Sequence, residues 1–144
     1  MKKILILNGP NLNMLGKREP DIYGHITLGE IEKRCKDLAN SKNIEIDFFQ
    51  SNNEADLIDK IHKSSNNFSG IIINAGAFTH TSIAIMDALL LVNIPVIEVH
   101  ISNIFRREQF RHNSYISLAS KGVICGLGVD SYLLAITALS NLMK

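Results

Sequence analysis

The sequence predicts an α/β fold in which five parallel strands form one open, doubly wound sheet. Three observations support this prediction. Short apolar runs alternate with amphipathic segments along the whole chain. The run at 70–74 (GIIIN) is almost wholly apolar, as expected of a parallel strand covered on both faces. The 144 residues suit a single domain, residues 1–144, and for a sheet of this size we expect the flavodoxin-like strand order 2-1-3-4-5.

The N-terminal part of the chain provides two strands separated by a helix. Residues 2–8 (KKILILN) are a short buried strand. Thr27 and Glu30 form a Thr-x-x-Glu capping box, which predicts a helix from residue 28 to about residue 41. Residues 44–50 (IEIDFFQ) are the second strand.

The remaining elements repeat the alternation. Asn52 or Asn53 can cap a helix from Glu54 to about Lys63. The later elements are a strand at 70–74, a helix at about 82–91, a strand at 95–101, a polar segment to about 114 that is helical in part, a strand at 122–126 and a helix at 130–143.

Composition and charge exclude several classes of function. The net charge of +1 gives no electrostatic footprint for nucleic acid or for an acidic membrane surface. The N-terminal apolar run is too short for a secretory signal, and no stretch is long enough to span a membrane, so we expect a cytoplasmic protein. Cys35 falls in a helix and Cys125 in an expected buried strand, and both read as reduced thiols. The spacing of the histidines, cysteines and carboxylates predicts no metal site.

In sheets of this kind, ligands bind beyond the carboxyl ends of the strands, where the strand order reverses. Here that point lies between the first and third strands. The loop at 16–25 (GKREPDIYGH) leaves the first strand and lies over it, with two basic residues, two acids, a tyrosine and a histidine. Gly16 and Gly24 at its ends are candidate hinges, although turn formation alone also explains them.

Polar side chains follow three of the strands at this end of the sheet. The dinucleotide and P-loop glycine motifs are absent, and the third strand ends in an asparagine rather than a phosphoacceptor aspartate. Amides, imidazoles and arginines suit a polar, hydroxylated, anionic small molecule. The side chains expected to converge are Asn11, Asn74, His80, Glu98, His100 and Ser102.

Glu98 and His100 are two positions apart on a strand, so their side chains share a face. A carboxylate beside an imidazole fixes its tautomer and favours the charged, proton-donating form. A buried structural ion pair and a catalytic pair are equally good readings of an isolated Glu-x-His. The position at the carboxyl end of a central strand favours catalysis.

The arginines and the remaining histidines receive different interpretations. Arg107 and Arg111 would share a face if their segment is helical, and Arg111 suits a substrate carboxylate, whereas Arg106 reads as solvated. His62 is expected at the surface and His25 in a structural loop position, and His112 is left undecided.

Taken together, five motifs resemble the type II 3-dehydroquinate dehydratases, in order and spacing from the first strand to the last helix. The motifs are NGPNLNMLGKREPDIYG, NAGAFTHTSIAIMDAL, EVHISN, REQFRHNSY and GLGVDSYLLA. The resemblance implies dehydration of 3-dehydroquinate to 3-dehydroshikimate in the shikimate pathway, without a metal or organic cofactor. It also implies a flavodoxin-like fold and a homododecamer built from four trimers.

The resemblance also implies roles for individual residues. Tyr23 matches the base that takes the C2 proton, and Arg18 matches the lid arginine that stabilises the tyrosinate. His100 matches the acid for the departing C1 hydroxyl, with Glu98 as its partner. The matched positions that contact water or substrate are Asn11 (the water that stabilises the enolate), Asn74, His80, Ile101, Ser102 and Arg111, together with Asp87, which reaches a neighbouring subunit's site.

The charged loop then has a chemical reason. A tyrosine ordinarily has a pKa of about 10, too high for a base at neutral pH. One guanidinium at about 4 Å supplies about 4 kcal/mol in favour of the tyrosinate at an effective dielectric of about 20. Arg18 is therefore sufficient, with Arg107 as a second candidate, and we expect the loop to close as a lid over the substrate.

Two other functions are compatible with the fold. One is a binding module that holds a small anion or nucleotide without chemistry, and the other is a different hydro-lyase or isomerase acting on a polyhydroxy carboxylate. The helix SIAIMDALLLV is apolar almost all round, with Asp87 as its only charge, so we expect another subunit to cover it.

Overall fold

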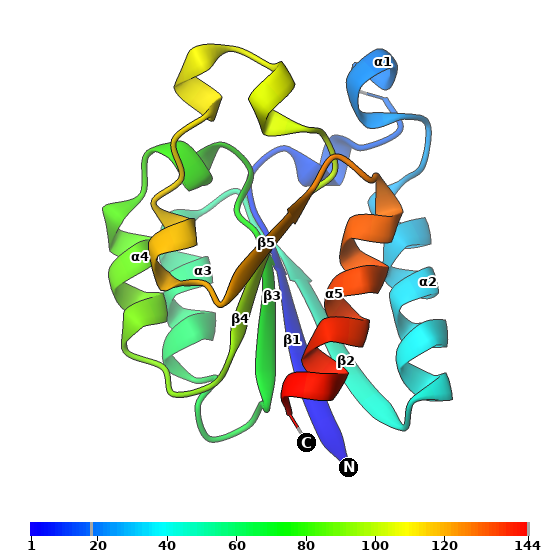
Figure 1. Cartoon of the computed structure of the whole chain (residues 1–144), viewed down its shortest axis with the longest axis vertical. Coiled ribbons are helices and arrows are strands. Elements are labelled where there is room, and N and C mark those ends of the chain that lie inside the picture. Colours follow the sequence, from blue (N-terminus) through cyan, green and yellow to red (C-terminus); the bar gives the residue numbers. More distant parts are fainter. Residues whose placement is uncertain (18, 144) are drawn as a thin grey trace.

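The protein is described here by a computed structural model that covers residues 1–17 and 19–143. Its centre is a sheet of five parallel strands in the order β2-β1-β3-β4-β5, which confirms the predicted fold class and strand order (Figure 1). The strands are β1 (Lys2–Asn8), β2 (Ile44–Gln50), β3 (Gly70–Asn74), β4 (Val96–His100) and β5 (Gly122–Cys125).

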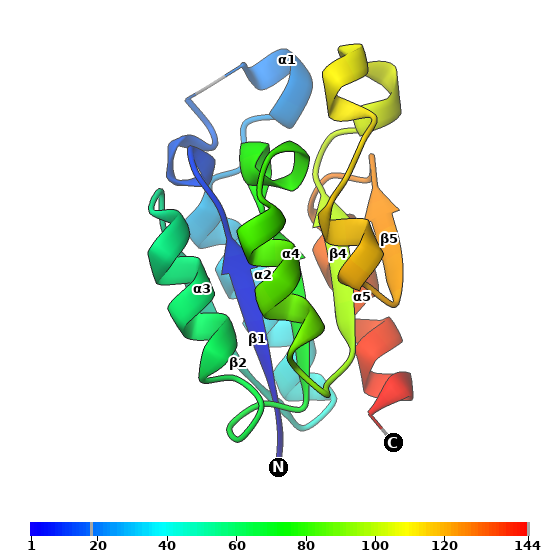
Figure 2. The same ribbon diagram turned by 90° about the vertical axis from the view of Figure 1, so that its left-hand side faces the viewer.

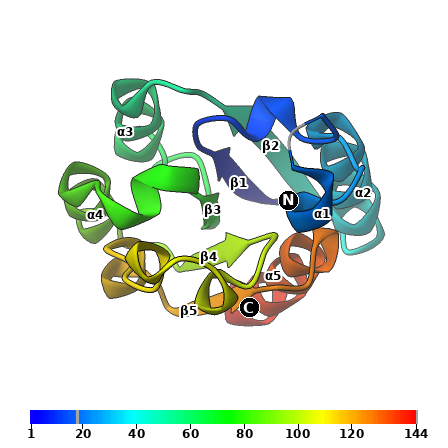
Figure 3. The same ribbon diagram turned by 90° about the horizontal axis from the view of Figure 1, so that it is seen from above.

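Four long helices cover the two faces of the sheet, with α2 and α5 on one face and α3 and α4 on the other (Figure 3). A fifth, single-turn helix lies in the loop after β1. The helices are α1 (Pro20–Tyr23), α2 (Leu28–Ser41), α3 (Glu54–His62), α4 (Ile83–Leu90) and α5 (Val129–Leu142). The central strands of the sheet are therefore covered by apolar side chains on both faces.

Side-chain caps fix the starts of α2, α3 and α4. The Thr27 hydroxyl accepts a hydrogen bond from the Glu30 backbone N–H at 3.2 Å, as the capping box predicts. At α3 the cap is Asn53, whose side-chain oxygen accepts from the Ala55 N–H at 2.9 Å, and this settles the choice between the two asparagines. Ser82 caps α4 in the same way.

The alternation of β1 divides the core in two. Ile4 and Ile6 pack with α2 and α5, whereas Leu5 and Leu7 pack with α3 and α4. All four side chains are completely buried. Full burial of one such side chain is worth about 1.5–3 kcal/mol, so β1 anchors both layers of the domain.

Two local expectations need correction, and one is confirmed. The loop at 16–25 contains the helix α1, because Pro20 at its first position has a backbone angle suited to a helix start. Residues 104–119 form three short 3₁₀ turns, which agrees with the expectation that the polar segment is helical in part. The strand that carries Cys125 is only partly buried, because β5 is the edge strand of the sheet.

The carboxyl ends of all five strands lie at one end of the molecule, and both termini lie at the other (Figure 1). Helix α1 and the 3₁₀ turns after β4 stand side by side above the carboxyl ends (Figure 2). Residues from the start, middle and end of the sequence therefore meet at this edge. In the described part of the chain, no helix has the length and apolar character needed to cross a bilayer.

Candidate active site

A pocket lies beyond the carboxyl ends of β1, β3 and β4, at the place predicted from the strand order. Its wall comes from the loop after β1, helix α1, the turn after β3 and the segment after β4. Nine of the residues singled out in the sequence line it: Asn11, Tyr23, Asn74, His80, His100, Ile101, Ser102, Arg107 and Arg111.

Glu98 and His100 form the buried pair expected from their spacing. The two side chains meet at 2.5 Å between Glu98 Oε2 and His100 Nε2, and Glu98 is completely buried. Burial acts to raise the pKa of Glu98, but hydrogen bonds from His100, Ser117 and Ser114 outweigh it and hold the pKa below its usual value. Glu98 therefore lies behind His100 as a carboxylate, and His100 faces the pocket.

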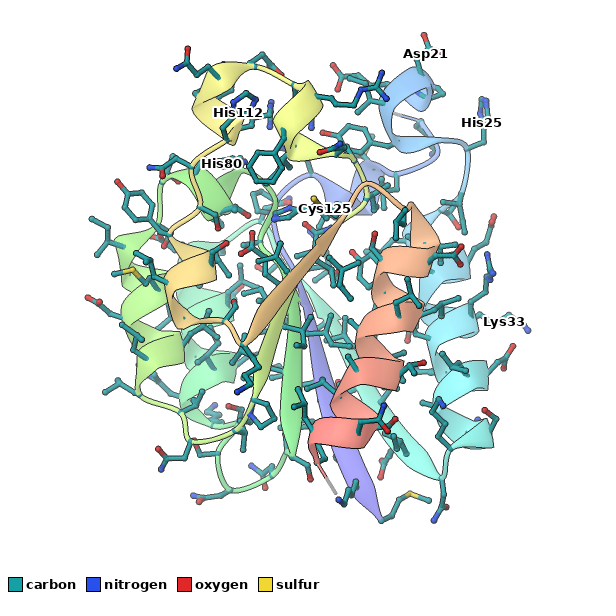
Figure 4. All side chains as sticks on the ribbon, in the orientation of Figure 1. Asp21, His25, Lys33, His80, His112 and Cys125 are labelled. Carbon is teal, nitrogen blue, oxygen red and sulfur yellow. The ribbon has the colours of Figure 1, made fainter. Side chains whose placement is uncertain are left out.

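His80 stands beside His100, with the ring centroids 6.5 Å apart and the planes nearly parallel. Its Nδ1 lies 2.9 Å from the Asn113 carbonyl oxygen, which can only accept, so Nδ1 carries the proton. Burial lowers the pKa of His80, which favours the neutral ring. Figure 4 shows His80 and His112 at the strands' carboxyl end, whereas Asp21 and His25 point outward.

Tyr23 enters the pocket from the end of α1. Arg107 Nη1 donates a hydrogen bond of 2.7 Å to the Tyr23 hydroxyl, and the guanidinium carbon lies 5.1 Å from the centre of the tyrosine ring. The same nitrogen donates to the Ser102 hydroxyl at 3.3 Å. A cation is thus fixed against the phenol oxygen.

The Asn74 amide is oriented by a buried tyrosine. Asn74 Nδ2 donates to the Tyr132 hydroxyl at 2.9 Å, and that hydroxyl donates to Asn8 Oδ1 at 2.7 Å. Asn74 Oδ1 accepts from the Gly76 N–H at 3.2 Å. Tyr132 is completely buried, and this burial raises the pKa of its hydroxyl, so it acts as a neutral link between the ends of β1 and β3.

Asn11 adopts a left-handed backbone conformation, with φ of 69°, at the start of the loop after β1. Its N–H donates to Asn52 Oδ1 at 3.0 Å, and Asn52 Oδ1 also accepts from Gln50 Nε2 at 3.2 Å. Close behind, a Cβ on Gly9 would stand 2.2 Å from the Ala75 carbonyl oxygen. Only glycine at position 9 lets the loops after β1 and β3 approach this closely.

The segment after β4 completes the wall with Ile101, Ser102 and Arg111. Arg111 Nε donates to Glu108 Oε1 at 3.1 Å, which fixes the guanidinium beside the pocket. Arg107 directly follows one 3₁₀ turn and Arg111 ends the next, so both line the pocket without sharing a helix.

The other predicted residues lie elsewhere. Arg18 falls outside the described residues, and Asp87 is exposed on α4, away from the pocket of its own chain. His62 is at the surface as expected, and His25 is exposed as well. His112 Nε2 donates to the Arg107 carbonyl oxygen at 3.0 Å, so this histidine supports the turn that presents Arg107. Gly16 and Gly24 have φ of +89° and +79°, as a turn requires.

Sequence reasoning missed Ser114, Ser117 and Tyr132, and it gave Arg107 only a secondary role. Arg107 was only a second candidate for the contact with Tyr23, because nothing in the sequence places residue 107 against α1. Ser114 and Ser117, which hydrogen-bond to Glu98, lie in a turn with no sequence signature. Tyr132 had a usable signal, since a tyrosine on the apolar face of a buried helix needs a partner for its hydroxyl.

Comparisons with known proteins agree with this geometry. The family described as dehydroquinase class II matches residues 2–140. A 3-dehydroquinate dehydratase of Endomicrobium trichonymphae is 58% identical, covering 99% of this chain and 100% of the relative. A 3-dehydroquinate dehydratase of Actinobacillus pleuropneumoniae serotype 5b is 59% identical, covering 100% of this chain and 94% of the relative.

Solved structures show the same likeness in three dimensions. The type II dehydroquinase of Butyrivibrio crossotus superposes with a TM-score of 0.94 at 48% identity, covering 96% of this chain and 97% of that one. The enzyme of Propionibacterium acnes gives a TM-score of 0.95 at 41% identity, covering 98% and 97%.

Side chains of the pocket can take a proton from a bound molecule and donate a proton to it. A cation-supported phenol stands on one wall and a carboxylate-supported imidazole on another, with amides and an arginine between them for an oxygen-rich anion. With the sequence match over nearly the whole length and the shared fold, these features establish that the chain belongs to the class II dehydroquinase family.

Proposed function

We propose that the chain is a hydro-lyase that dehydrates 3-dehydroquinate to 3-dehydroshikimate by anti elimination through an enolate, with Tyr23 as the base and His100 as the acid. The observation that carries the proposal is the pairing of two proton-transfer groups with their partners in one pocket: Tyr23 with Arg107, and His100 with Glu98. The names of the relatives support the same reaction.

The first step is removal of the proton at C2 of the substrate. Tyr23 acts as a tyrosinate, whose negative charge the Arg107 guanidinium stabilises from 2.7 Å. Arg18, which the family resemblance places on the lid, adds a second cation. The electron pair of the broken C–H bond moves into the neighbouring ketone, which gives the enolate, and a water positioned by Asn11 stabilises the enolate oxygen.

The second step is departure of the C1 hydroxyl. His100 donates its proton to this oxygen as the C1–O bond breaks, and the oxygen keeps the electron pair and leaves as water. The enolate electrons form the new C1–C2 double bond and regenerate the ketone. Glu98 accepts from His100 Nε2 and stabilises the protonated ring before the transfer.

The rest of the pocket orients the substrate. Arg111 is the cation for the carboxylate, because a guanidinium binds a carboxylate in a planar, two-pronged geometry. The remaining contacts, to hydroxyl and carbonyl oxygens, come from Asn74, His80, Ile101 and Ser102. The neutral His80 ring offers Nε2 as an acceptor, since its Nδ1 proton is donated to Asn113.

The proposal includes the setting of the reaction. The enzyme works in the cytoplasm, in the shikimate pathway of aromatic amino acid biosynthesis, without a metal or organic cofactor. It assembles as a homododecamer, a tetramer of trimers, and Asp87 of one subunit reaches the site of its neighbour.

Absorbance at the enone band of the product, measured after 3-dehydroquinate is added, tests the proposal. Tyr23→Phe and His100→Ala should each lower kcat by at least about 100-fold, because each removes one proton-transfer group. His62→Ala, a surface histidine, is the matched control and should keep normal turnover. Binding of substrate without turnover by the unmodified protein would favour the binding module instead, and turnover of another polyhydroxy carboxylate alone would favour a different hydro-lyase or isomerase.

A further inference from the structure

Residues 113–117 lie outside the pocket, where they contact His80 directly and contact Glu98, the partner of His100. The segment lies between β4 and β5 and includes the start of the 3₁₀ turn Ile116–Ala119. Its Tyr115 N–H donates to the Thr79 carbonyl oxygen at 3.0 Å, which ties the segment to the turn that carries His80. None of the five residues lines the pocket itself.

Two serines of this segment donate to the buried carboxylate of Glu98. Ser117 Oγ lies 2.5 Å from Oε1, and Ser114 Oγ lies 2.9 Å from Oε2 and 3.1 Å from Oε1. Ser114 Oγ also accepts from the Ser117 N–H at 3.0 Å, so its own proton is directed at Glu98. Because His100 Nε2 also hydrogen-bonds to Oε2, each oxygen of the Glu98 carboxylate has at least two hydrogen-bonding neighbours.

The hydrogen bonds of the two histidines leave different ring nitrogens for the pocket. The Asn113 carbonyl takes the Nδ1 proton of His80, which leaves Nε2 for the substrate. Glu98 takes the Nε2 proton of His100, which leaves Nδ1 for the substrate. Opposite nitrogens of the two stacked rings are therefore left for one ligand. Asn113 sets the choice at His80, whereas Glu98, which Ser114 and Ser117 contact, sets it at His100.

We propose that residues 113–117 are a positioning segment of the active site, in which Ser114 and Ser117 hold Glu98 ionised and in place so that His100 delivers its proton from Nδ1. This inference rests on the proposed role of His100 as the acid. If the Glu98 carboxylate rotated or took up a proton, it would no longer stabilise the protonated imidazole of His100. His100 would then lack the proton that it donates to the substrate.

The electrostatic surroundings agree with this role. Burial acts to raise the pKa of Glu98, and the donors that outweigh it are His100, Ser117 and Ser114. Two of these three donors belong to the segment. Among the described residues, His80 is stacked on His100, Arg111 acts on His80, and Cys125 is the neighbour of His100 on β5. Loss of the hydroxyls should therefore let Glu98 take up a proton at a higher pH.

The test compares kcat, KM and the pH profile of kcat for three variants of the full-length protein. Ser117→Ala removes one donor, and Ser114→Ala/Ser117→Ala removes both. Ser120→Ala is the matched control, because the Ser120 hydroxyl donates to the Ile116 carbonyl oxygen in the same turn and does not touch Glu98. Ser117→Cys, with a side chain of similar size and a weaker donor, replaces Ser117→Ala if that variant does not fold.

We expect kcat to fall about tenfold in Ser117→Ala and about 100-fold in the double variant, with KM unchanged within about twofold. The acid limb of the kcat profile should move to higher pH by about one unit in the double variant, and Ser120→Ala should match the unmodified enzyme. Unchanged kcat and an unmoved acid limb in folded serine variants would overturn the proposal, as would an equal loss in Ser120→Ala.

His100→Ala separates this inference from the function on which it rests. An inactive His100→Ala with fully active serine variants would overturn only the role of residues 113–117. A fully active His100→Ala would overturn the proposed acid, and with it the proposed mechanism.

Discussion

Arg107 Nη1 donates a hydrogen bond of 2.7 Å to the Tyr23 hydroxyl, joining two residues that are 84 positions apart in the sequence. Tyr23 stands at the end of α1 in the loop after β1, and Arg107 follows a 3₁₀ turn after β4. The Arg107 side chain is only 12% exposed, so its charge is poorly screened by water and acts strongly on the phenol oxygen. This contact links helix α1 to the segment after β4.

The first prediction follows from this contact. Arg107→Ala should lower kcat by about 100-fold or more, because the tyrosinate loses a fixed cation in a partly dry pocket. Arg106→Ala is the matched control, since Arg106 is the adjacent arginine and is exposed. Steady-state kinetics on both variants checks the prediction. Equal effects of the two changes would mean that Arg107 is not the residue that activates Tyr23.

The site shows which features a sequence can reveal. Glu98 and His100 were predictable because strand periodicity alone places them on one face, and the strand order alone places that face at the crevice. The Arg107–Tyr23 and Ser117–Glu98 contacts were not, because both depend on how irregular loops fold over the sheet. No periodic pattern describes such loops, and their residues meet only after the sheet has formed.

Tyr132→Phe should reduce the free energy of unfolding by about 1–3 kcal/mol. The change leaves Asn8 Oδ1 and Asn74 Nδ2 buried without the hydroxyl that now bridges them. Tyr115→Phe is the control, since no hydrogen bond of its hydroxyl is found among the described residues. Urea unfolding at one fixed protein concentration measures the free energy of unfolding of both variants. Equal stability of the two variants would mean that water replaces the lost hydroxyl.

Stability should fall as the pH drops below about 6.5, in part through His80. Burial lowers the pKa of His80 in the folded state, so below 6.5 the unfolded chain binds a proton that the folded chain resists. Proton binding then stabilises the unfolded state, so the free energy of unfolding decreases as the pH falls. In His80→Asn, where an amide nitrogen can replace Nδ1 as the donor to Asn113, this part of the pH dependence should disappear.

Unfolding of His80→Asn, the unmodified protein and His62→Asn should be compared between pH 5 and pH 8, a window of about 1.5 units on each side of the His80 reference value. The surface variant His62→Asn should keep the full pH dependence. If the free energy of unfolding changed with pH in His80→Asn as it does in the unmodified protein, His80 would not be the source of this pH dependence.

Activity should survive treatment with EDTA, and borohydride added with substrate should not inactivate the enzyme. A Schiff-base route needs a lysine amine at the substrate, and no lysine is among the described residues that line the pocket. Within the same part of the chain, no three metal-ligating side chains come together. Intact-mass measurement after borohydride treatment checks the second outcome, and covalent capture at a lysine would overturn the tyrosine-based mechanism.

The last prediction concerns the outer face of α4. The helix packs its inner face against the sheet, whereas Ile83, Leu90 and Leu91 are 52%, 57% and 73% exposed. Apolar side chains gathered on one helix in this way are typical of a surface that another subunit covers. Asp87 lies exposed among them.

A carboxylate at such an interface is costly unless it meets a partner, so Asp87 should pair across the contact. Asp87→Leu should therefore weaken the trimer and lower activity together, although Asp87 takes no part in proton transfer. Asp37→Leu on α2, where Asp37 pairs with Lys33 on an exposed face, is the control and should change neither property. Sedimentation and turnover should be measured on the same sample. A large oligomer with normal activity in Asp87→Leu, or a fully active monomer of the unmodified protein, would show that α4 does not form this interface.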